Sequence, residues 1–318
     1  MQTVDCNLCG SDKSGELFLA RDYTFASEER FSYVKCPECG LVFLSPRPSP
    51  EEIGRYYPDQ YYQKYGAGSP ELMFLRGDYS EDIAKIGLPG RILDVGCQKG
   101  VFLKDMQDKG WDCYGVDISE TACEIARDSR GLENIYTGDI QDVNLPENYF
   151  DVITLWHVIE HLYDPRAVIC KLRKLLKPDG VLVIECPNID SVSGRLFGAC
   201  WQPLEAPRHL YQFSVSTLRD LMLLSGFRVR SIEYMPKPLM NMVGLKVSFL
   251  RFLGMEKPGM LSENPEKPGA GNLIKRTSLL WITARKILTF LCFILSMGFA
   301  YLKRPEIIRI YALPENKS

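Results

Sequence analysis

The sequence predicts an α/β fold in which a parallel sheet carries helices on both faces. Short apolar segments alternate with stretches of helical character from residue 92 onward, the pattern of consecutive βαβ units. The segment 92–100 joins one such strand to a glycine turn before a helix. The 318 residues are 46% hydrophobic and 25% charged, which is typical of a folded globular protein.

Two Cys-x-x-Cys pairs open the chain. Cys6 and Cys9 form the first pair, Cys36 and Cys39 the second, and 26 residues separate them. This paired spacing is typical of a closed tetrahedral Zn²⁺ site with four thiolates. Four unrelated buried thiols, or a redox-active pair, are the alternatives. We predict a zinc ribbon over 1–45 whose folding depends on the metal.

A proline-rich stretch comes after the predicted ribbon. The alternating prolines of 45–50 predict an extended, stiff linker. Clustered tyrosines come next, and they can form a flap over a ligand or pack against the domain. These tyrosines are Tyr56, Tyr57, Tyr61, Tyr62 and Tyr65. We assign 46–70 to this linker and flap.

Two glycines shape the turn after the first core strand. Gly96 and Gly100 lack a Cβ, so the backbone can turn sharply there and approach a ligand closely. An ordinary strand-to-helix turn is the alternative reading of the glycines alone. The next strand and the acid at its end favour a ligand site.

An acidic residue ends this next predicted strand, 113–116. Asp117 lies 23 positions after Asp94, and an acid there can accept hydrogen bonds from ribose hydroxyls. The dinucleotide fingerprint Gly-x-Gly-x-x-Gly needs glycines where Gln98 and Val101 stand. A ligand with ribose and adenine but no pyrophosphate therefore fits better.

The alternation continues to the end of the predicted core. We expect helices over 120–129 and 217–226, and strands before Asp139 and over 150–155, 181–185, 228–235 and 306–313. Ligand-binding loops should gather at the carboxyl ends of the strands. Asp139 is a candidate ligand residue there, and capping of a turn is its alternative role.

Asp94, Gly96 and Gly100 resemble motif I, Asp-x-Gly-x-Gly-x-Gly, of class I S-adenosylmethionine-dependent methyltransferases. The resemblance implies a Rossmann-like sheet and S-adenosylmethionine as cofactor. It implies cofactor contacts from Asp94, Gly96, Gly100, Asp117, Ile118, Asp139, Ile140 and His157. Gln98 replaces the middle glycine, so either the loop opens slightly or this side chain turns away from the methionine moiety.

The chain's only three histidines come after the fourth and fifth strands. His157 and His161 are spaced as one helical turn, so we expect both imidazoles on one face. We predict His161 and His209 as base or acceptor-positioning groups, with Glu160 as orienting partner. Capping and loop hydrogen bonding are alternative roles. His-x-x-Glu-His also matches the inverzincin protease pattern, so a metal shared by His157 and His161 stays open.

The loop around His209 is similar to the acceptor-side loop of ubiquinone-type O-methyltransferases. Trp201, Arg208 and Tyr211 are candidates to line an acceptor pocket. Arg208 can hold a phosphate or carboxylate, or it can form a surface ion pair. Residues 36–43 look like the front of bacterial methyltransferases that carry an N-terminal zinc ribbon, and the resemblance extends to about residue 235.

The last part of the chain is basic and apolar. Residues 236–318 hold 13 Lys and Arg against five Asp and Glu, whereas 1–235 are acidic. The uncharged run 287–302 is short for a membrane span. Together with 239–253 it predicts a helical unit that lies on a membrane, receives a lipid-linked acceptor, makes a dimer contact, or packs on the domain. Peripheral membrane contact is thus expected through 239–304.

These observations predict a methyltransferase for a small-molecule or glycan acceptor, including sugar-containing and lipid-linked ones. Quinol-type O-methylation is the second reading, and a non-catalytic zinc-ribbon binding protein with a degenerate cofactor site is the third. A polar start and scattered thiols indicate a cytoplasmic protein, with no nucleic-acid partner expected. The segments are 1–45 ribbon, 46–70 linker and flap, 71–235 core, 236–305 helical insertion and 306–318 last strand.

Overall fold

A seven-stranded mixed sheet forms the centre of the computed structural model, which describes residues 1–24, 29–57, 79–234, 238–255 and 279–315. Its order is β10-β11-β8-β7-β4-β5-β6. The strands from β4 to β8 pair in parallel, and β11 is antiparallel to both β8 and β10. The strands are β4 Arg91–Val95, β5 Asp112–Asp117, β6 Asn134–Thr137, β7 Phe150–Trp156, β8 Leu176–Pro187, β10 Phe227–Tyr234 and β11 Ile307–Pro314.

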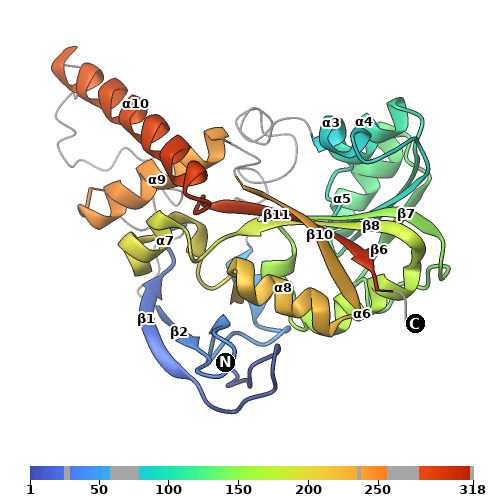
Figure 1. Cartoon of the computed structure of the whole chain (residues 1–318), viewed down its shortest axis with the longest axis horizontal. Coiled ribbons are helices and arrows are strands. Elements are labelled where there is room, and N and C mark those ends of the chain that lie inside the picture. The colour runs from blue at the N-terminus through green and yellow to red at the C-terminus, as the bar shows by residue number, and fades with distance from the viewer. Residues whose placement is uncertain (25–28, 58–78, 235–237, 256–278, 316–318) are drawn as a thin grey trace.

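Helices cover both faces of this sheet, as the sequence predicts (Figure 1). The period-two alternation of the strands divides the core: Ile92 packs in the cluster with α3, α4 and α5, whereas Leu93 packs in the cluster with α6 and α8. The helices are α3 Tyr79–Ala84, α4 Val101–Asp108, α5 Glu120–Glu124 with the π turn η2 Ile125–Ser129, α6 Pro165–Leu175 and α8 Val215–Leu224. The predicted α/β architecture is therefore confirmed.

The N-terminal ribbon forms a second, four-stranded antiparallel sheet. Its strands are β1 Gly15–Arg21, β2 Arg30–Lys35, β3 Val42–Leu44 and β9 Tyr211–Gln212. Strand β9 comes from the core, where it pairs with β3 through Phe43 and Tyr211. The ribbon is thus completed by a segment that lies far away in the sequence.

The proline-rich segment after the ribbon packs against the core. Arg47 is buried; its guanidinium donates hydrogen bonds of 3.0 Å to Tyr211 Oη and 3.1 Å to Tyr163 O. Tyr163 in turn donates to Pro48 O. The short helix η1 Ile53–Tyr56 comes next. Of the predicted flap tyrosines, Tyr61, Tyr62 and Tyr65 lie outside the described residues.

Several short helical turns connect the second half of the core: η3 Ile159–His161, α7 Val192–Phe197, η4 Gly198–Cys200 and η5 Gln202–Leu204. The predicted insertion then forms two packed helices, α9 Pro238–Phe252 and α10 Leu279–Tyr301. Asn241 of α9 accepts the backbone N–H of Glu306, which anchors the insertion at the start of β11.

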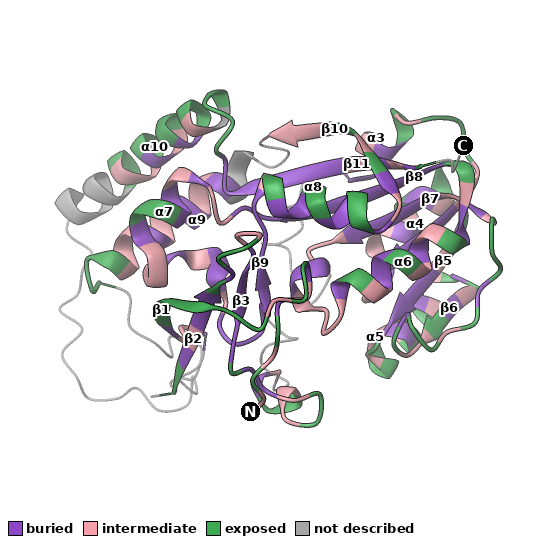
Figure 2. Cartoon of the chain, turned by 60° about the horizontal axis from the view of Figure 1, so that its bottom comes forward, coloured by how far each residue is buried: buried purple, intermediate pink, exposed green. Residues whose placement is uncertain are grey.

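Helix α10 projects away from the central sheet, and its outer side is exposed (Figures 1 and 2). The inner side of α10 is mixed: Cys292 and Ser296 are buried, Leu288 and Phe299 pack against the core, and Lys246 of α9 donates to Thr289. Large apolar side chains are exposed instead: Ile287, Phe290, Leu291, Ile294, Leu295 and Met297. No helix in the described ranges is long and apolar enough to cross a bilayer.

Candidate functional site

The carboxyl ends of three neighbouring strands form the edge where the predicted cofactor residues lie. Strand β4 pairs in parallel with both β5 and β7. The turns after Val95, Asp117 and Trp156 are therefore adjacent on one side of the sheet.

Both turn glycines are required by conformation and by space. Gly96 and Gly100 have φ angles of +76° and +70°. A Cβ on Gly96 would lie 2.5 Å from Val158 Cγ2, and one on Gly100 would lie 2.5 Å from Leu132 Cδ1. Any other residue would strain the backbone and clash. The loop after β7, which carries Val158, thus lies directly against the glycine turn.

Gln98, at the position of the middle glycine of the resembled motif, has a left-handed backbone conformation. Its φ is +49°, and its backbone N–H donates a 2.8 Å hydrogen bond to Asp117 Oδ2. The backbone therefore keeps the turn, and the cost of a non-glycine residue there is about 1 kcal/mol. The substitution changes the side chain beside the turn without removing the turn.

The two strand-end acids have different surroundings. Asp94 is buried, and Thr154 Oγ1 donates a 2.7 Å hydrogen bond to its Oδ1, so it braces β4 against β7. Asp117 accepts the N–H groups of Gln98 and Ser119. Burial raises the pKa of Asp117, and these two hydrogen bonds partly oppose that shift. Asp117 keeps lone pairs for further donors.

The residues predicted on the adenine side lie at the ends of β5 and β6. Ile118 is 76% exposed directly after Asp117. Asp139 is exposed and accepts the N–H of Gln141 at 2.8 Å, so it caps a turn, while Ile140 is buried in the core. Capping of the turn leaves the second Asp139 oxygen available to a ligand.

His157 is held between two glutamates at the end of β7. Its Nδ1 lies 3.4 Å from Glu160 Oε1 and its Nε2 lies 3.3 Å from Glu185 Oε1. Burial lowers the pKa of His157, but the two carboxylates outweigh burial and raise it to about 9. The prediction that His157 and His161 share one helical face is wrong, because His157 has a φ of +56° and only the short 3-10 turn η3 comes after it.

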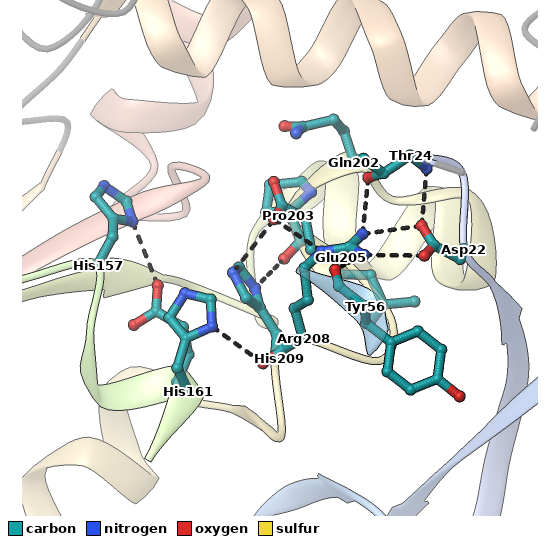
Figure 3. Close-up of polar contacts among 12 residues, drawn as sticks. Asp22, Thr24, Tyr56, His157, His161, Gln202, Pro203, Glu205, Arg208 and His209 are labelled. Carbon is teal, nitrogen blue, oxygen red and sulfur yellow. Dashed lines mark hydrogen bonds and ion pairs between the residues drawn. The ribbon is translucent and has the colours of Figure 1, made fainter. Parts of the chain in front are cut away.

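His161 and His209 lie together although they come from different loops, one after β7 and one before β9. Their ring centroids are 4.5 Å apart, edge to face. His161 Nδ1 lies 3.0 Å from Arg208 O, and His209 Nδ1 lies 2.7 Å from Pro203 O (Figure 3). Because a carbonyl only accepts, each Nδ1 carries the proton and each neutral ring keeps a lone pair on Nε2. The Nε2 of His209 lies 3.8 Å from Glu205 Oε2.

Both imidazoles are kept neutral. Burial, aided by His209, lowers the pKa of His161 to about 4. Burial likewise lowers the pKa of His209 to about 4, although the charge of Glu160 opposes the shift. The two rings therefore act as lone-pair donors at neutral pH.

Glu160 completes this arrangement, and we call Glu160, His161 and His209 the Glu-His-His cluster. Glu160 is 1% exposed. Burial raises its pKa, but the protonated His157 prevails, so the pKa of Glu160 lies below its usual value. One ligand atom from each of the three residues lies within 4.8 Å of the others. The structure thus brings the three predicted acceptor-side residues together.

Sequence reasoning missed the network behind His157. Glu185 accepts from Tyr79 Oη at 2.8 Å and from Arg309 at 2.6 and 2.9 Å. Arg309 also pairs with Asp82 at 2.7 Å. The signal was present, since Glu185 is the charged residue of the otherwise apolar run 181–187 and a buried acid needs a partner.

Arg208 does not face an acceptor pocket or the surface. It is buried and makes two 2.9 Å hydrogen bonds to Asp22, with a third of 2.7 Å to Thr24 Oγ1 (Figure 3). Trp201 and Tyr211 are buried in the core as well. The prediction that Arg208 holds an acceptor anion is therefore wrong. The ion pair of Arg208 with Asp22 instead attaches the loop of His209 to the ribbon.

The four ribbon cysteines converge on one point. Their sulfur atoms lie within 4.8 Å of one another, with Cys6 Sγ 3.4 Å from Cys39 Sγ and Cys9 Sγ 3.5 Å from Cys36 Sγ. The two knuckles are built alike. The backbone N–H of the first cysteine in each, Cys6 or Cys36, donates to the carbonyl of the residue five positions later. The carbonyl of the same cysteine accepts from the N–H of the glycine four positions later. This donor set fits a tetrahedral Zn²⁺ site.

Known proteins resemble the chain in sequence and in fold. A family model described as a methyltransferase domain matches residues 72–232. Ubiquinone biosynthesis O-methyltransferase of Hahella chejuensis is 33% identical over 125 residues, 37% of this chain and 51% of that protein. Malonyl-acyl-carrier-protein O-methyltransferase of Serratia marcescens is 26% identical over 142 residues, 44% and 55% of the two chains. The chain thus spans about half the length of the curated relatives it matches.

The crystal structure of the cyclase SpnF superimposes with a TM-score of 0.51 at 16% identity, over 86% of this chain and 99% of that chain, which shows a shared fold. The family match covers half of the chain and includes the glycine turn, Asp117 and the Glu160–His161 segment. The chain belongs to the class I S-adenosylmethionine-dependent methyltransferases.

Proposed function

We propose that the protein transfers the methyl group of S-adenosylmethionine to an oxygen atom of a small-molecule acceptor. The observation that carries this proposal is the Glu-His-His cluster at the carboxyl end of β7. It lies one loop away from the glycine turn, because Val158 packs on Gly96 and Glu160 comes two residues later. Cofactor and acceptor residues would therefore face one space.

The cofactor residues would bind through the edge formed by β4, β5 and β6. S-Adenosylmethionine supplies an electrophilic methyl group. Asp117 would accept from the ribose hydroxyls, Asp139 from the adenine amino group, and the exposed Ile118 would contact the ring, with the buried Ile140 packed behind it. The glycine turn, braced by Asp94, would let the backbone approach the methionine moiety. His157 would contribute its charge at the same edge.

The acceptor residues would align a hydroxyl for in-line displacement. His161 or His209 would accept the hydroxyl hydrogen bond through Nε2, since each Nδ1 is occupied by a carbonyl. Glu160 would orient this pair and stabilise positive charge that develops as the proton leaves. The surrounding buried side chains would keep water out.

Oxygen as the accepting atom is supported by the names of the relatives, which are O-methyltransferases of ubiquinone biosynthesis and of malonyl-acyl-carrier protein. We therefore place a quinol-like or lipid-linked hydroxyl first among acceptors. A sugar hydroxyl is the next class to test.

We propose peripheral contact of the insertion with an anionic membrane. The support is the outward apolar side of α10 and the exposed Lys303 and Arg304 at its end. Replacing Ile294 and Leu295 by Ser should reduce sedimentation with anionic liposomes at low salt. Leu223→Ser, which changes a comparably exposed leucine on α8, is the matched control; equal loss in both would contradict the proposal.

We also propose a structural Zn²⁺ in the ribbon, bound by Cys6, Cys9, Cys36 and Cys39. The matched knuckles and the converging sulfurs support a closed site with no open position. Native mass spectrometry should find one bound zinc, and Cys36→Ser should lose it. Four freely alkylated thiols in the native protein would rule the site out.

The function itself is tested with labelled cofactor. Calorimetry should first show S-adenosylmethionine binding, and labelled methyl groups should then pass to a hydroxyl in a panel of quinol-like, lipid-linked and sugar acceptors. His209→Ala should leave cofactor affinity unchanged and slow turnover. Methyl transfer found only on nitrogen or carbon acceptors would contradict the proposed chemistry.

A further inference from the structure

We propose that a cleft between the ribbon and helix α9 of the insertion binds the phosphate group of an amphiphilic acceptor. This inference deepens the proposed function and rests on it for the methyl transfer to that acceptor. It gives a binding role to Arg21 and Arg251, which belong neither to the cofactor edge nor to the Glu-His-His cluster.

Three separate parts of the chain line the cleft: the end of β1 with the residues after it, the turns η4 and η5, and the last turn of α9. The backbone N–H of Gln202 in η5 donates a 2.8 Å hydrogen bond to Ser248 Oγ of α9, so two of the walls are fixed to each other. The polar lining residues are Arg21, Tyr23, Thr24, Gln202, Glu205 and Arg251.

Two guanidinium groups give the lining a positive charge. Arg251 is held in place, because its Cζ lies 4.3 Å from the centre of the Tyr23 ring and its Nη1 lies 3.5 Å from Gln202 O. Arg21 forms no ion pair with any residue that the structure describes. Glu205 supplies the one carboxylate of the lining, so the two arginines prevail.

The nearby carboxylates are directed to other cations. Asp22 accepts two 2.9 Å hydrogen bonds from Arg208. Glu205 Oε2 lies 4.0 Å from Arg208 Nε and 3.8 Å from His209 Nε2. The positive charge of Arg208 is therefore balanced by acids, whereas the cleft above it keeps an excess of positive charge.

Thr24 supplies an independent observation. It is 7% exposed, and its Oγ1 accepts a 2.7 Å hydrogen bond from Arg208 Nη2. Because a guanidinium N–H only donates, the hydroxyl hydrogen of Thr24 needs an acceptor of its own, and the described part of the chain offers none. Figure 3 shows Thr24 and Gln202 beside each other above the guanidinium of Arg208. An anion in the cleft would accept from Thr24.

This set of donors favours phosphate over carboxylate. A phosphate ester carries up to two negative charges and several acceptor oxygens, which match the two guanidinium groups of Arg21 and Arg251. The hydroxyl of Thr24 and the side-chain amide of Gln202 add neutral donors from another side. A carboxylate would leave part of this charge and several of these donors unmatched.

The cleft meets the Glu-His-His cluster at Glu205. This residue lines the cleft, and its Oε2 lies 3.8 Å from His209 Nε2. An acceptor whose phosphate binds in the cleft would therefore carry its hydroxyl toward His209. The phosphate would act as a handle that orients the acceptor for methyl transfer.

Exposed apolar side chains adjoin both arginines. Phe252 and Leu253, directly after Arg251, are 59% and 50% exposed. On β1 the period-two alternation places Leu19, also exposed, on the same face as Arg21. An apolar body attached to the phosphate would bury these side chains, so we assign the ligand to amphiphilic phosphate esters.

The test is calorimetric titration of the full chain with octyl phosphate below its micelle concentration, without acceptor. Wild type should bind one equivalent, and Arg21→Gln and Arg251→Gln should each weaken binding about tenfold to hundredfold, as expected for a lost hydrogen-bonded charge. Arg219→Gln, at an exposed arginine of α8, is the matched control and should keep wild-type affinity. Inorganic phosphate should compete for the same site but bind roughly tenfold more weakly, because it buries no apolar surface.

Absence of saturable binding by wild type, or an equal loss in Arg219→Gln, would overturn the cleft as a phosphate site. Equal affinity for octyl phosphate and inorganic phosphate would overturn the amphiphilic ligand. S-Adenosylmethionine calorimetry on each variant reports folding. Because phosphate binding is measured without methyl transfer, the two failures differ: methyl transfer to a quinol-like hydroxyl without octyl phosphate binding overturns only the cleft, and octyl phosphate binding without any O-methylation overturns only the proposed function.

Discussion

The cofactor edge and the acceptor cluster occupy adjacent loops but are built in different ways. The cofactor edge joins the short loops after neighbouring parallel strands, and its central turn, from Asp94 to Asp117, is held mainly by backbone geometry. The Glu-His-His cluster joins a turn after β7 to a loop that the ribbon holds in place. A local motif therefore determines the first, whereas tertiary packing determines the second.

The largest effect should come from breaking the attachment of the acceptor loop. Asp22→Ala removes the two close hydrogen bonds to the buried guanidinium of Arg208 and leaves it one more distant carboxylate, Glu205 Oε2 at 4.0 Å from Nε, which should cost about 3–5 kcal/mol of unfolding free energy. Urea unfolding measures this. Arg195→Ala, at a half-exposed pair with Asp190, is the control and should cost about 1 kcal/mol or less. Similar losses would mean that burial of the Arg208 pair is unimportant.

The next effect should be confined to the cofactor edge. Asp117→Asn replaces the carboxylate that would accept hydrogen bonds from the ribose hydroxyls by a neutral amide. A hydrogen bond to a charged group contributes about 1.5–3 kcal/mol. S-Adenosylmethionine affinity should fall roughly tenfold to hundredfold. Calorimetry measures it, with His209→Ala as the variant that keeps affinity. A loss of affinity in His209→Ala as large as in Asp117→Asn would show that the two regions are not separable.

A pH-dependent effect should appear beneath the acceptor loops, at the start of β11. Burial raises the pKa of Glu306 to about 8, although the polar groups of Ser193 and Trp201 oppose this shift. The folded state then holds a proton that the unfolded state has lost, so stability should fall as pH rises from the ordinary range of a glutamate toward 8, by up to about 1.4 kcal/mol per pH unit.

Glu306→Gln should flatten this slope, because the amide does not ionise. Urea unfolding across that pH range measures both proteins, and Glu315→Gln, at an exposed glutamate after the same strand, is the matched control. An unchanged slope in Glu306→Gln would assign the pH dependence to other groups.

The smallest effect should be at the irregular position of the glycine turn. Gln98→Gly removes the strain of a positive φ, which stabilises the folded state, but it also makes the unfolded chain more flexible, which destabilises it. Each contribution is about 1 kcal/mol, so the two nearly cancel. Stability and cofactor affinity should stay close to wild type. Gln98→Val, which is β-branched, should destabilise clearly. A large gain of affinity in Gln98→Gly would show that the glutamine side chain obstructs the cofactor.

The sequence was informative where structure is local. The succession of strands along the core, both glycine positions and the thiol knuckles can be predicted from spacing and period, because neighbouring residues determine them. The role of Arg208 could not be predicted, since its partner Asp22 lies in the ribbon. The partnership of His209 with His161, rather than of His157 with His161, also depends on long-range packing.

Strand β9 gives the molecule a particular order of assembly. The ribbon's β3 edge pairs with residues made long after it during synthesis, so the N-terminal sheet cannot be completed until the core loop arrives. Contacts of such large sequence separation form slowly, since the entropy of loop closure is lost before the contacts stabilise the chain. Because the pairing that completes the ribbon also sets the loop of His209, we expect the acceptor cluster to form late in folding.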